Sequence, residues 1–373
     1  MLTRRAFNGA VPAFIAGTAL FTVGSAESDV FHLGLLGQSL LRHDLRGHSW
    51  HDEAQIGSML RGFDACFSNL ECVILGARAG EPTRAVDGVH SAPAEVIDYL
   101  SGLGVTHFAA SNNHSFDLGT GGILDTIEAF RHRGLMAAGL GVNDSAARAP
   151  VHRSGRRGGT VAVVAAAAGM VREGGSATTD RPGVNEIRRE PNGDMNSLDV
   201  RRTLDSIATA RKSADFVIAY LHNHYWESDI SVTPKWQRQL AREMIDAGAS
   251  VFVAHGTPLL QGMEMYSGAP LFHGLSSFFF QTRKSPDAYG QANWQSLIVD
   301  CKFIGGQFEE AAMTPLRLQA VGDGGAADFV TRGRPHLAVG ADRDRIIDNV
   351  VALSAALDQP LRIRDGVGVL RAS

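Results

Sequence analysis

The feature that most limits the possible folds is a repeated alternation of short apolar runs with segments of helical period. Runs rich in Val, Phe, Ala and Leu, such as DFVIAYL, are separated by stretches in which apolar residues recur every three to four positions. Strands joined by crossover helices produce this pattern. The sequence therefore predicts an α/β or α+β fold built on layered sheets. At 373 residues and 44% hydrophobic composition, the chain is long enough for a large core.

Apolar spacing predicts five helices. In one of them, apolar residues repeat from Ile123 to Phe130, Gly134 suits a left-handed C-terminal cap, and Asp117 or Thr120 could cap the start. The other four lie near residues 94–100, 198–212, 235–247 and 341–357. Residues 76–93 and 169–196 lack sustained periodicity, and loops of this length are usually functional lids or mobile segments. We expect one domain over residues 27–318, with residues 319–373 as a C-terminal extension packed on it.

The first 26 residues have the order of a twin-arginine export signal. Arg4 and Arg5 precede an apolar stretch from Ala10 to Val23, and small residues follow at Gly24-Ser25-Ala26. The apolar stretch is shorter than the roughly 18 to 20 residues that span a bilayer. We therefore expect an exported, periplasmic or otherwise extracytoplasmic protein with no stable membrane span in its mature form.

Charge and cysteine content exclude several classes of function. The net charge is −4 with no long run of either sign, which argues against a nucleic-acid footprint or a polybasic membrane patch. A small-molecule or polymer substrate fits better. The three cysteines, Cys66, Cys72 and Cys301, are too few for a disulfide framework and allow one bridge at most.

Polar residues follow five predicted strands at the point where each strand ends. The crevice outside the carboxyl ends of strands is where open α/β sheets bind ligands, so neighbouring strands would bring these residues together. A single histidine at a strand end is more often a hydrogen-bonded structural residue, and only the combination indicates a site. The five ends are Gly37-Gln38, Asn69-Leu70-Glu71, Asn112-Asn113-His114, His222-Asn223-His224 and His255-Gly256-Thr257-Pro258.

The residue types at these ends suit a metal site. His222 and His224 are two positions apart on an extended segment, so their side chains face the same side. With Glu71, Asn113 and His255 they would supply imidazole, amide and carboxylate ligands, which favour one or two ions of zinc, manganese or iron. Such a centre polarises a phosphoryl or acyl oxygen and lowers the pKa of a bound water.

Two further residues are candidates for proton transfer. His114 lies beside Asn113 with its own ring free, so it could protonate a leaving group. Asp117 could orient that ring or could instead cap the helix that follows. Both roles of Asp117 remain open from the sequence.

The order of these segments resembles the CapA family of capsule and poly-gamma-glutamate synthesis proteins. The similarity runs from about Phe31 to Leu318 and is carried by NLE, by NNHSFDLGTGGILDTIEAF with RGLMAAGLG, and by IDAGASVFVAHGTPLLQGMEMYSGAPLFHGLSSFFFQ. The resemblance implies a calcineurin-like metallophosphatase fold, in which two β-sheets flanked by helices form a four-layer sandwich. It implies metal-site roles for Glu71, Asn113, His222 and His255, with His224 as an additional member, and a catalytic role for His114.

The chain departs from the family pattern at the same site. Gln38 stands where the family usually has aspartate, Pro258 where it has a second histidine, and Ser276-Ser277 where it has Gly-Asn. His43 and Asp44 lie near Gln38 in the sequence and could replace a lost ligand, or they could be solvated loop residues. Asn69 and Asn112 are further candidates for contacts with a substrate or ion.

Three functions fit these observations. The first is a metal-dependent hydrolase of a phosphoester or an anionic envelope polymer, with one or two ions. The second is a non-catalytic scaffold or polymer-binding component that works with the capsule synthesis machinery, and the third is a periplasmic binding module for an anionic ligand. Several imidazoles at strand ends favour the enzyme, because each buried ring nitrogen needs a partner and a scaffold has no need of them. The losses at Gln38 and Pro258 favour the scaffold.

Overall fold

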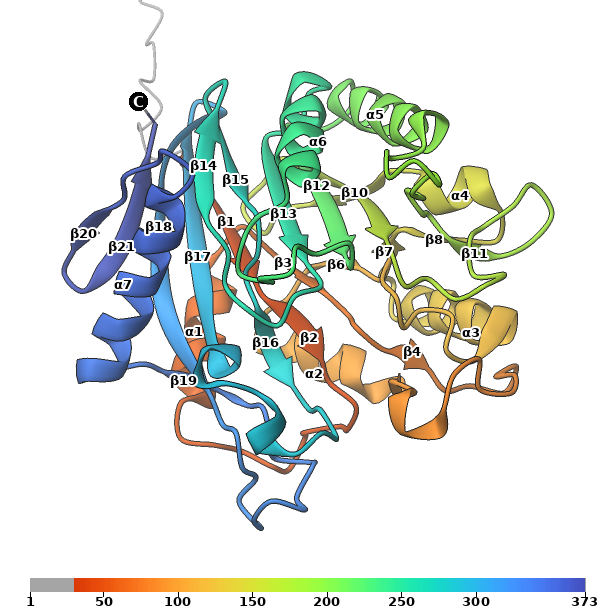
Figure 1. The fold of residues 1–373 in the computed structure, drawn as a ribbon, viewed down its shortest axis with the longest axis horizontal. Coiled ribbons are helices and arrows are strands. Elements are labelled where there is room, and N and C mark those ends of the chain that lie inside the picture. Colours follow the sequence, from red (N-terminus) through yellow and green to blue (C-terminus); the bar gives the residue numbers. More distant parts are fainter. Residues whose placement is uncertain (1–29, 373) are drawn as a thin grey trace, which may run out of the picture.

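Two mixed β-sheets pack face to face, and helices cover their outer faces to give four layers (Figure 1). This computed structural model describes residues 30–372, so the predicted export signal lies outside the described residues. The α/β class and the four-layer sandwich expected from the sequence are confirmed. No helix within residues 30–372 combines the length and the apolar composition needed to cross a membrane.

The first sheet is formed by the two ends of the described chain. Its strand order is β20-β21-β18-β17-β1-β3-β6-β7, with β19 paired to β18. Strands β1, β3, β6 and β7 are parallel, whereas the later strands are antiparallel, so residues after 318 extend this sheet. The bounds are β1 Val30–Leu36, β3 Ala65–Asn69, β6 His107–Ala109, β7 Ala137–Ala138, β17 Gln295–Ile304, β18 Gln307–Leu318, β19 Pro335–Leu337, β20 Arg362–Arg364 and β21 Val367–Arg371.

The second sheet comes from the middle of the chain. Its order is β14-β15-β13-β12-β10-β9, with a parallel centre and an antiparallel strand at each edge. The bounds are β9 Val151–Ser154, β10 Thr160–Ala168, β12 Phe216–Asn223, β13 Val251–His255, β14 Met263–Tyr266 and β15 Ala269–Phe272. Three short pairs complete the strands: β2 (Gln38–Leu40) with β16 (Ser277–Phe280), β4 (Val73–Ile74) with β5 (Ser91–Ala92), and β8 (Leu140–Gly141) with β11 (Gly183–Val184).

The main core lies between the two sheets. Along β12, Phe216, Ile218 and Tyr220 point into this core, while the residues between them face the helices. The same alternation carries His222 onto the inner face at the carboxyl end of β12. A strand that is covered on both faces has a continuous run of apolar residues in its sequence, as DFVIAYL does.

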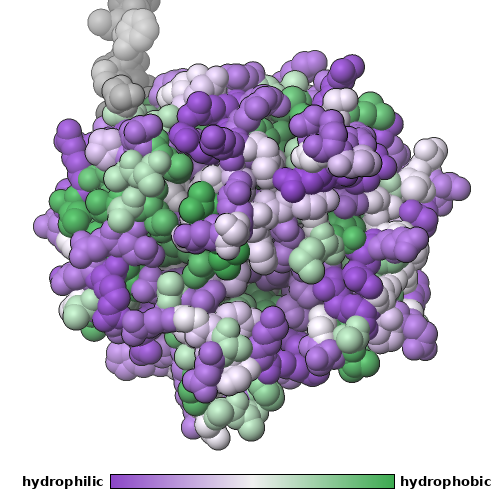
Figure 2. All heavy atoms as spheres, viewed as in Figure 1, coloured by the Kyte–Doolittle hydropathy of each residue, from purple (hydrophilic) through white to green (hydrophobic). Residues whose placement is uncertain are grey.

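The helices cover the two outer faces. Helices α1 (Glu53–Gly62), α2 (Glu95–Leu103) and α3 (Gly119–His132) pack on the first sheet, and α5 (Ser197–Arg211) and α6 (Lys235–Asp246) pack on the second. The short α4 (Asp144–Arg148) contacts β8, and α7 (Gly340–Ala355) packs on β18, β14 and β21. All five predicted helices form. Hydrophobic residues gather over β20 and β21 at the left of Figure 2, where Ile363 is exposed.

Some local predictions hold and one is wrong. Gly134 has the left-handed φ of +63° expected for a cap. Neither Asp117 nor Thr120 caps α3, because the residue before the helix is Leu118 and its side chain makes no capping bond. Residues 76–93 and 169–196 are irregular apart from a 3-10 turn at Val86–Gly88 and the short strands β5 and β11. The three cysteines are buried free thiols.

A buried ion cluster ties α6 to β14. Glu264 on β14 is 3% exposed, and its carboxylate accepts hydrogen bonds from Arg238 Nη2 at 2.6 Å and Arg242 Nη2 at 2.8 Å. His273 Nε2 lies 3.0 Å from the other oxygen of Glu264. Burial alone would raise the pKa of Glu264, but the hydrogen bonds from His273, Arg238 and Arg242 outweigh it and hold this pKa below its usual range.

Replacing Glu264 with glutamine is therefore expected to lower the free energy of unfolding by about 1 to 3 kcal/mol at neutral pH. A lowered pKa stabilises the fold above the pKa of an unfolded glutamate, roughly 4.3, and this contribution is lost as the pH falls further. Urea titrations from pH 7 to pH 3 should show the wild type and the variant converging in acid. Glu243→Gln on α6 is the matched control, with an expected change within about 0.5 kcal/mol. A difference that does not vary with pH would contradict this account.

Candidate metal centre

The five polar strand ends meet at one end of the sandwich, but they come from both sheets. Strands β1, β3 and β6 belong to the first sheet, whereas β12 and β13 belong to the second. Their carboxyl ends border a cavity of about 570 Å³. Figure 2 shows a hollow near the middle of this face. Residues lining the cavity include Gln38, Glu71, Arg84, His90, Asn113, His114, His224 and Pro258.

Strand register and one glycine position the histidines. Strands β12 and β13 are parallel, and their register pairs His222 with His255. Directly after β13 the chain passes so close to β12 that a Cβ on Gly256 would lie 2.0 Å from the carbonyl oxygen of Asn223. Gly256 also has a φ of +115°, which side-chain-bearing residues rarely adopt. The last loop can therefore follow the cavity wall only with glycine at this position.

Four potential metal-ligand atoms lie close together, and His222 Nε2 is the central one. Its Nε2 lies 2.9 Å from Asn113 Oδ1, 3.1 Å from His224 Nε2 and 3.7 Å from Glu71 Oε1. Donor atoms of Glu71, His222 and His224 all lie within 4.8 Å of one another. The structure thus brings together four of the five predicted metal-site residues.

A proton on His222 Nε2 can satisfy only one of these contacts. A neutral imidazole nitrogen donates at most one proton, yet three potential acceptors surround His222 Nε2. The other nitrogen, Nδ1, faces the hydroxyl of Tyr220 at 3.2 Å, which can fix the tautomer that leaves a lone pair on Nε2. A divalent cation would accept lone pairs from all four atoms. Two nitrogens and two oxygens fit zinc, manganese or iron.

Burial sets the charge state of these groups. It lowers the pKa of His222 well below the usual value and that of His224 to about 3, so both rings are neutral and carry lone pairs. Burial, with a smaller contribution from Asp117, raises the pKa of Glu71 to about 8. A neighbouring cation would favour the carboxylate form of Glu71.

His255 lies beside this cluster and outside the four convergent atoms. Its Nε2 is 3.0 Å from the carbonyl oxygen of Leu36, so Nε2 carries the proton and donates it. Its Nδ1 is buried and has no partner among the described residues. Metal-binding histidines commonly donate their second nitrogen to a backbone carbonyl in this way.

Asp117 holds the ring of His114. Asp117 Oδ2 lies 2.7 Å from His114 Nδ1 and accepts the backbone N–H of His90 at 2.8 Å, while Oδ1 pairs with Arg84 Nε at 2.5 Å. Of the two roles left open for Asp117, the geometry selects orientation of the ring. Burial, followed by the charge of Arg84, holds the pKa of His114 well below its usual value.

Arg84 and His90 were missed by sequence reasoning. Both lie in residues 76–93, whose lack of periodicity indicated a functional or mobile loop without indicating which side chains matter. The ring of His90 stacks on that of His114 with centroids 3.5 Å apart and planes 16° apart. Glu71, His90 and His114 also have donor atoms within 4.8 Å of one another. The lone pairs of stacked rings lie in parallel planes, so one ion cannot lie in both ring planes, and this trio suits a single ion less well than the His222 cluster.

The remaining predicted residues occupy the walls or lie outside the cavity. Gln38 Oε1 accepts the N–H of Gly256 at 2.9 Å. Asn112 Nδ2 donates to Asn69 Oδ1 at 3.2 Å and to the carbonyl of Leu70 at 2.8 Å, which links β3 to the loop after β6.

The structure does not bring His43 and Asp44 to the cavity wall as replacement ligands. The carboxylate of Asp44 is bound by Arg46 at 2.7 Å, and the backbone N–H of His43 donates to Gln281 Oε1 at 3.0 Å. Of the two alternatives for this pair, the position of Asp44 agrees with an ion-paired loop residue.

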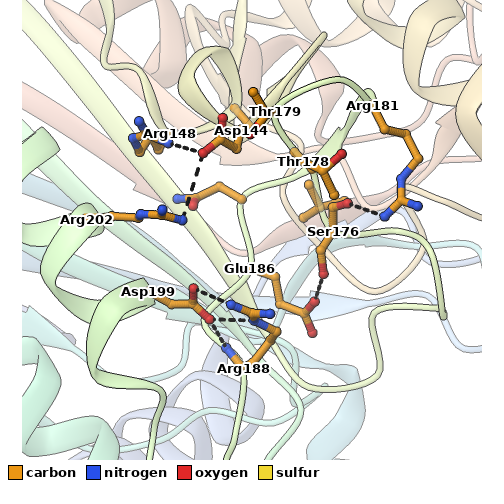
Figure 3. Close-up of a pocket in the computed structure, with 14 residues that line it drawn as sticks. Asp144, Arg148, Ser176, Thr178, Thr179, Arg181, Glu186, Arg188, Asp199 and Arg202 are labelled. Atoms are coloured by element: carbon orange, nitrogen blue, oxygen red, sulfur yellow. Dashed lines mark hydrogen bonds and ion pairs between the residues drawn. The ribbon is translucent and has the colours of Figure 1, made fainter.

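A second cavity, of about 410 Å³, lies between α4, α5 and residues 176–188 (Figure 3). Four arginines line it, but each already has a partner within the protein. Arg148 and Arg188 pair with Asp144 and Asp199 at 2.7 Å, Arg202 lies 3.9 Å from Asp144, and Arg181 donates to the carbonyl of Ser176. An incoming anion would have to displace these partners.

Several known proteins are similar to this chain in sequence. The uncharacterized protein y4sH of Sinorhizobium fredii is 24% identical over 92% of this chain and 93% of its own length. The PGA biosynthesis protein CapA of Bacillus subtilis is 30% identical over 50% of this chain and 45% of its own. The capsule biosynthesis protein CapA of Bacillus anthracis is 28% identical over 60% and 52%.

Among solved structures, the NAD nucleotidase NadN of Haemophilus influenzae aligns with a TM-score of 0.38 and 11% identity, over 86% of this chain and 56% of that one. The family described as "Bacterial capsule synthesis protein PGA_cap" matches residues 30–282, which hold every residue of the candidate metal centre. The chain belongs to this family of bacterial capsule synthesis proteins.

Proposed function

We propose that this protein is an exported, metal-dependent hydrolase of phosphoester type that takes part in the synthesis of a capsule or polyglutamate-like envelope polymer. The observation that carries the proposal is the convergence of two imidazoles, an amide oxygen and a carboxylate around His222 Nε2, next to a histidine oriented by Asp117. Family membership supports the cellular role, and the RR-containing leader sequence supports export.

The residues of the site would have three roles: binding the ion, transferring a proton and attracting an anionic substrate. Glu71, Asn113, His222 and His224 would hold the ion, with His255 beside them, and the ion when bound would polarise a phosphoryl oxygen and acidify a water. His114 lines the cavity with Nδ1 held by Asp117, which leaves Nε2 free towards the cavity. Because burial keeps the ring neutral, Nε2 would first take a proton from the attacking water and then pass it to the leaving group. Arg84 adds positive charge at the cavity wall, where an anionic substrate would lie.

A second candidate function is a non-catalytic scaffold or polymer-binding component. It is favoured by the positions at which the chain departs from its family. The side chain of Gln38 serves as a backbone hydrogen-bond acceptor for Gly256, and Pro258 lines the cavity without offering a side-chain ligand. A site with one metal position remaining could bind a polymer without cleaving it.

The two functions differ in metal content and turnover. We expect the purified mature protein to carry up to one equivalent of a transition metal, and to hydrolyse generic phosphomonoesters or phosphodiesters only when loaded. Bound metal should also raise the melting temperature, because a ligand that binds only the folded state stabilises it by mass action. Elemental analysis and thermal melts with and without chelator measure the first property, and a substrate screen measures the second. Metal without turnover would favour the scaffold, and absence of both metal and turnover would contradict the enzyme.

A further inference from the structure

Met170 has a backbone conformation that its residue type does not favour. Within residues 30–372, five residues other than glycine have a positive φ, and four of them are serine or aspartate. Ser267 and Asp365 lie in the hairpin turns after β14 and β20, and Asp358 follows α7, where left-handed residues are common. Met170, with a φ of 56°, is the only large apolar residue of the five. It lies in neither a hairpin turn nor a helix end.

Met170 is also exposed at the wall of the metal-site cavity. Its side chain is 60% exposed and lines the cavity that holds the candidate metal centre. Gly169 before it has a φ of +85°, and a Cβ there would lie 3.1 Å from the ring of Tyr225. Two successive left-handed residues thus bring Met170 to the cavity wall, where no core packing offsets the strain. Backbone strain of this kind is concentrated at active sites and ligand-binding sites.

Trp226 lies on the neighbouring chain segment of the same wall. Strands β10 and β12 are parallel, with Ala168 in register with Asn223, so the residues after both strands leave the sheet side by side (Figure 1). The Nε1 of Trp226 donates to the carbonyl oxygen of Asn223 at 2.6 Å, which fixes the indole ring. This ring packs on that of His224, with centroids 4.6 Å apart and planes 36° apart. A fixed aromatic surface therefore adjoins one of the candidate metal ligands.

The cavity has more apolar surface than the chemistry at a metal ion needs. Besides Met170 and Trp226, it is lined by Leu40, Ile230, Pro258, Phe280 and Tyr289. Small-molecule sites combine such walls with a few polar groups that fix the orientation of the ligand. A polymer rich in carboxylates would lose hydration against this surface without gaining partners for its charges. The apolar wall therefore fits the organic part of a small phosphoester better.

We propose that Met170 and Trp226 bind a flat aromatic group carried by the alcohol part of the phosphoester. An aromatic ring would gain favourable contacts with the indole and with the thioether of Met170, in addition to the apolar area that it buries. A saturated group would gain only the buried area. The inference rests on the proposed phosphoester hydrolase and names the organic group that its cavity recognises.

The test compares three phosphonates on the full mature protein loaded with metal. Methylphosphonate, cyclohexylmethylphosphonate and benzylphosphonate share one anionic group, and their carbon–phosphorus bond is not hydrolysed, so calorimetry measures binding without turnover. We expect benzylphosphonate to bind at least about tenfold more tightly than methylphosphonate, because its ring buries apolar area. It should also bind about 2- to 10-fold more tightly than the cyclohexyl analogue, although the saturated ring is the larger apolar group.

Two variants assign this selectivity to the wall, and each is judged by a ratio of affinities, which cancels any change in metal content. Trp226→Leu keeps an apolar side chain but removes the ring, so the preference for benzylphosphonate over the cyclohexyl analogue should disappear. In Met170→Gly the preference for benzylphosphonate over methylphosphonate should fall about 2- to 10-fold. Its melting temperature should not fall, because glycine adopts a φ of 56° readily. A methionine with only a structural role would give the opposite result.

Met136→Gly is the matched control, since Met136 is 58% exposed, does not line the cavity and has no positive φ. It should keep both affinity ratios of the wild type. The proposal is overturned if none of the phosphonates binds, if benzylphosphonate is not preferred, or if Trp226→Leu retains the preference. If the leucine variant does not fold, an unchanged ratio in Met170→Gly overturns it.

A nucleoside phosphonate and a naphthylmethylphosphonate, compared in the same assay, distinguish a nucleobase from a hydrocarbon ring. Tighter binding of either than of the cyclohexyl analogue agrees with the proposal and identifies the kind of ring. The selectivity can be found even where no hydrolysis is detected, which would contradict the proposed enzyme and keep this inference. Conversely, an active enzyme with equal affinity for all of the phosphonates would refute this inference and leave the proposed function intact.

Discussion

His222→Ala is expected to abolish metal binding and, with it, metal-dependent hydrolysis. His222 Nε2 is the atom around which the other three donors converge, and the side chain is 0% exposed. Loss of an outer partner of a metal ligand typically costs 10- to 100-fold in metal affinity, and loss of the ligand itself should cost more than about 100-fold. Elemental analysis and calorimetric titration of the chelator-treated protein measure this change.

His107→Ala is the matched control for burial. His107 is 2% exposed and lies on the first sheet, at the start of β6, where it contacts Thr106 Oγ1 and the carbonyl of Arg153. Removing it should lower stability, as removing any buried side chain does, while metal stoichiometry stays at the wild-type value. A His222→Ala protein that folds and retains its metal would refute the assignment of the centre.

The sequence predicted many of the elements, although not α1 or α4, and it did not predict how the strands pair. Apolar periodicity located all five predicted helices and the strands that end in polar residues, because both patterns arise from which face of an element is buried. Periodicity does not report which strands are neighbours. The ends of β3 and β12 meet only because the two sheets stack on each other. That they lie close together could therefore be established only from the tertiary structure.

The same limit applies inside the site. Asp117 had two roles consistent with its local sequence, and the choice depends on Arg84 and the backbone of His90, which belong to another loop. Resemblance to the family also did not separate structural from functional residues. Glu264 and His273 lie in the block that carries the resemblance, and they form a buried ion cluster with α6. Ser276 stands where the family usually has glycine. Its φ is positive, at 58°, which is a backbone conformation that glycine adopts more readily than serine.

His114→Ala is expected to slow hydrolysis by about 10²- to 10⁴-fold while leaving the metal content unchanged. The ring donates through Nδ1 to Asp117 and faces the cavity, so it can serve the leaving group without binding the ion. Asp117→Asn should also slow hydrolysis, because an amide in place of the carboxylate can hold the ring in the wrong tautomer. Both rates are measured as kcat/KM at saturating metal, alongside elemental analysis of each variant.

The choice of substrate separates proton donation from every other role of His114. An alkyl phosphate needs its leaving oxygen protonated, whereas a nitrophenyl phosphate releases an anion that is stable without a proton. If His114 is the acid, the loss of rate in His114→Ala should be large with the alkyl ester and much smaller with the nitrophenyl ester. An equal loss with both esters, accompanied by loss of metal, would show that His114 is a metal ligand. The ion would then be bound by Glu71, His90 and His114, although the stacking of the two rings makes this site less favourable.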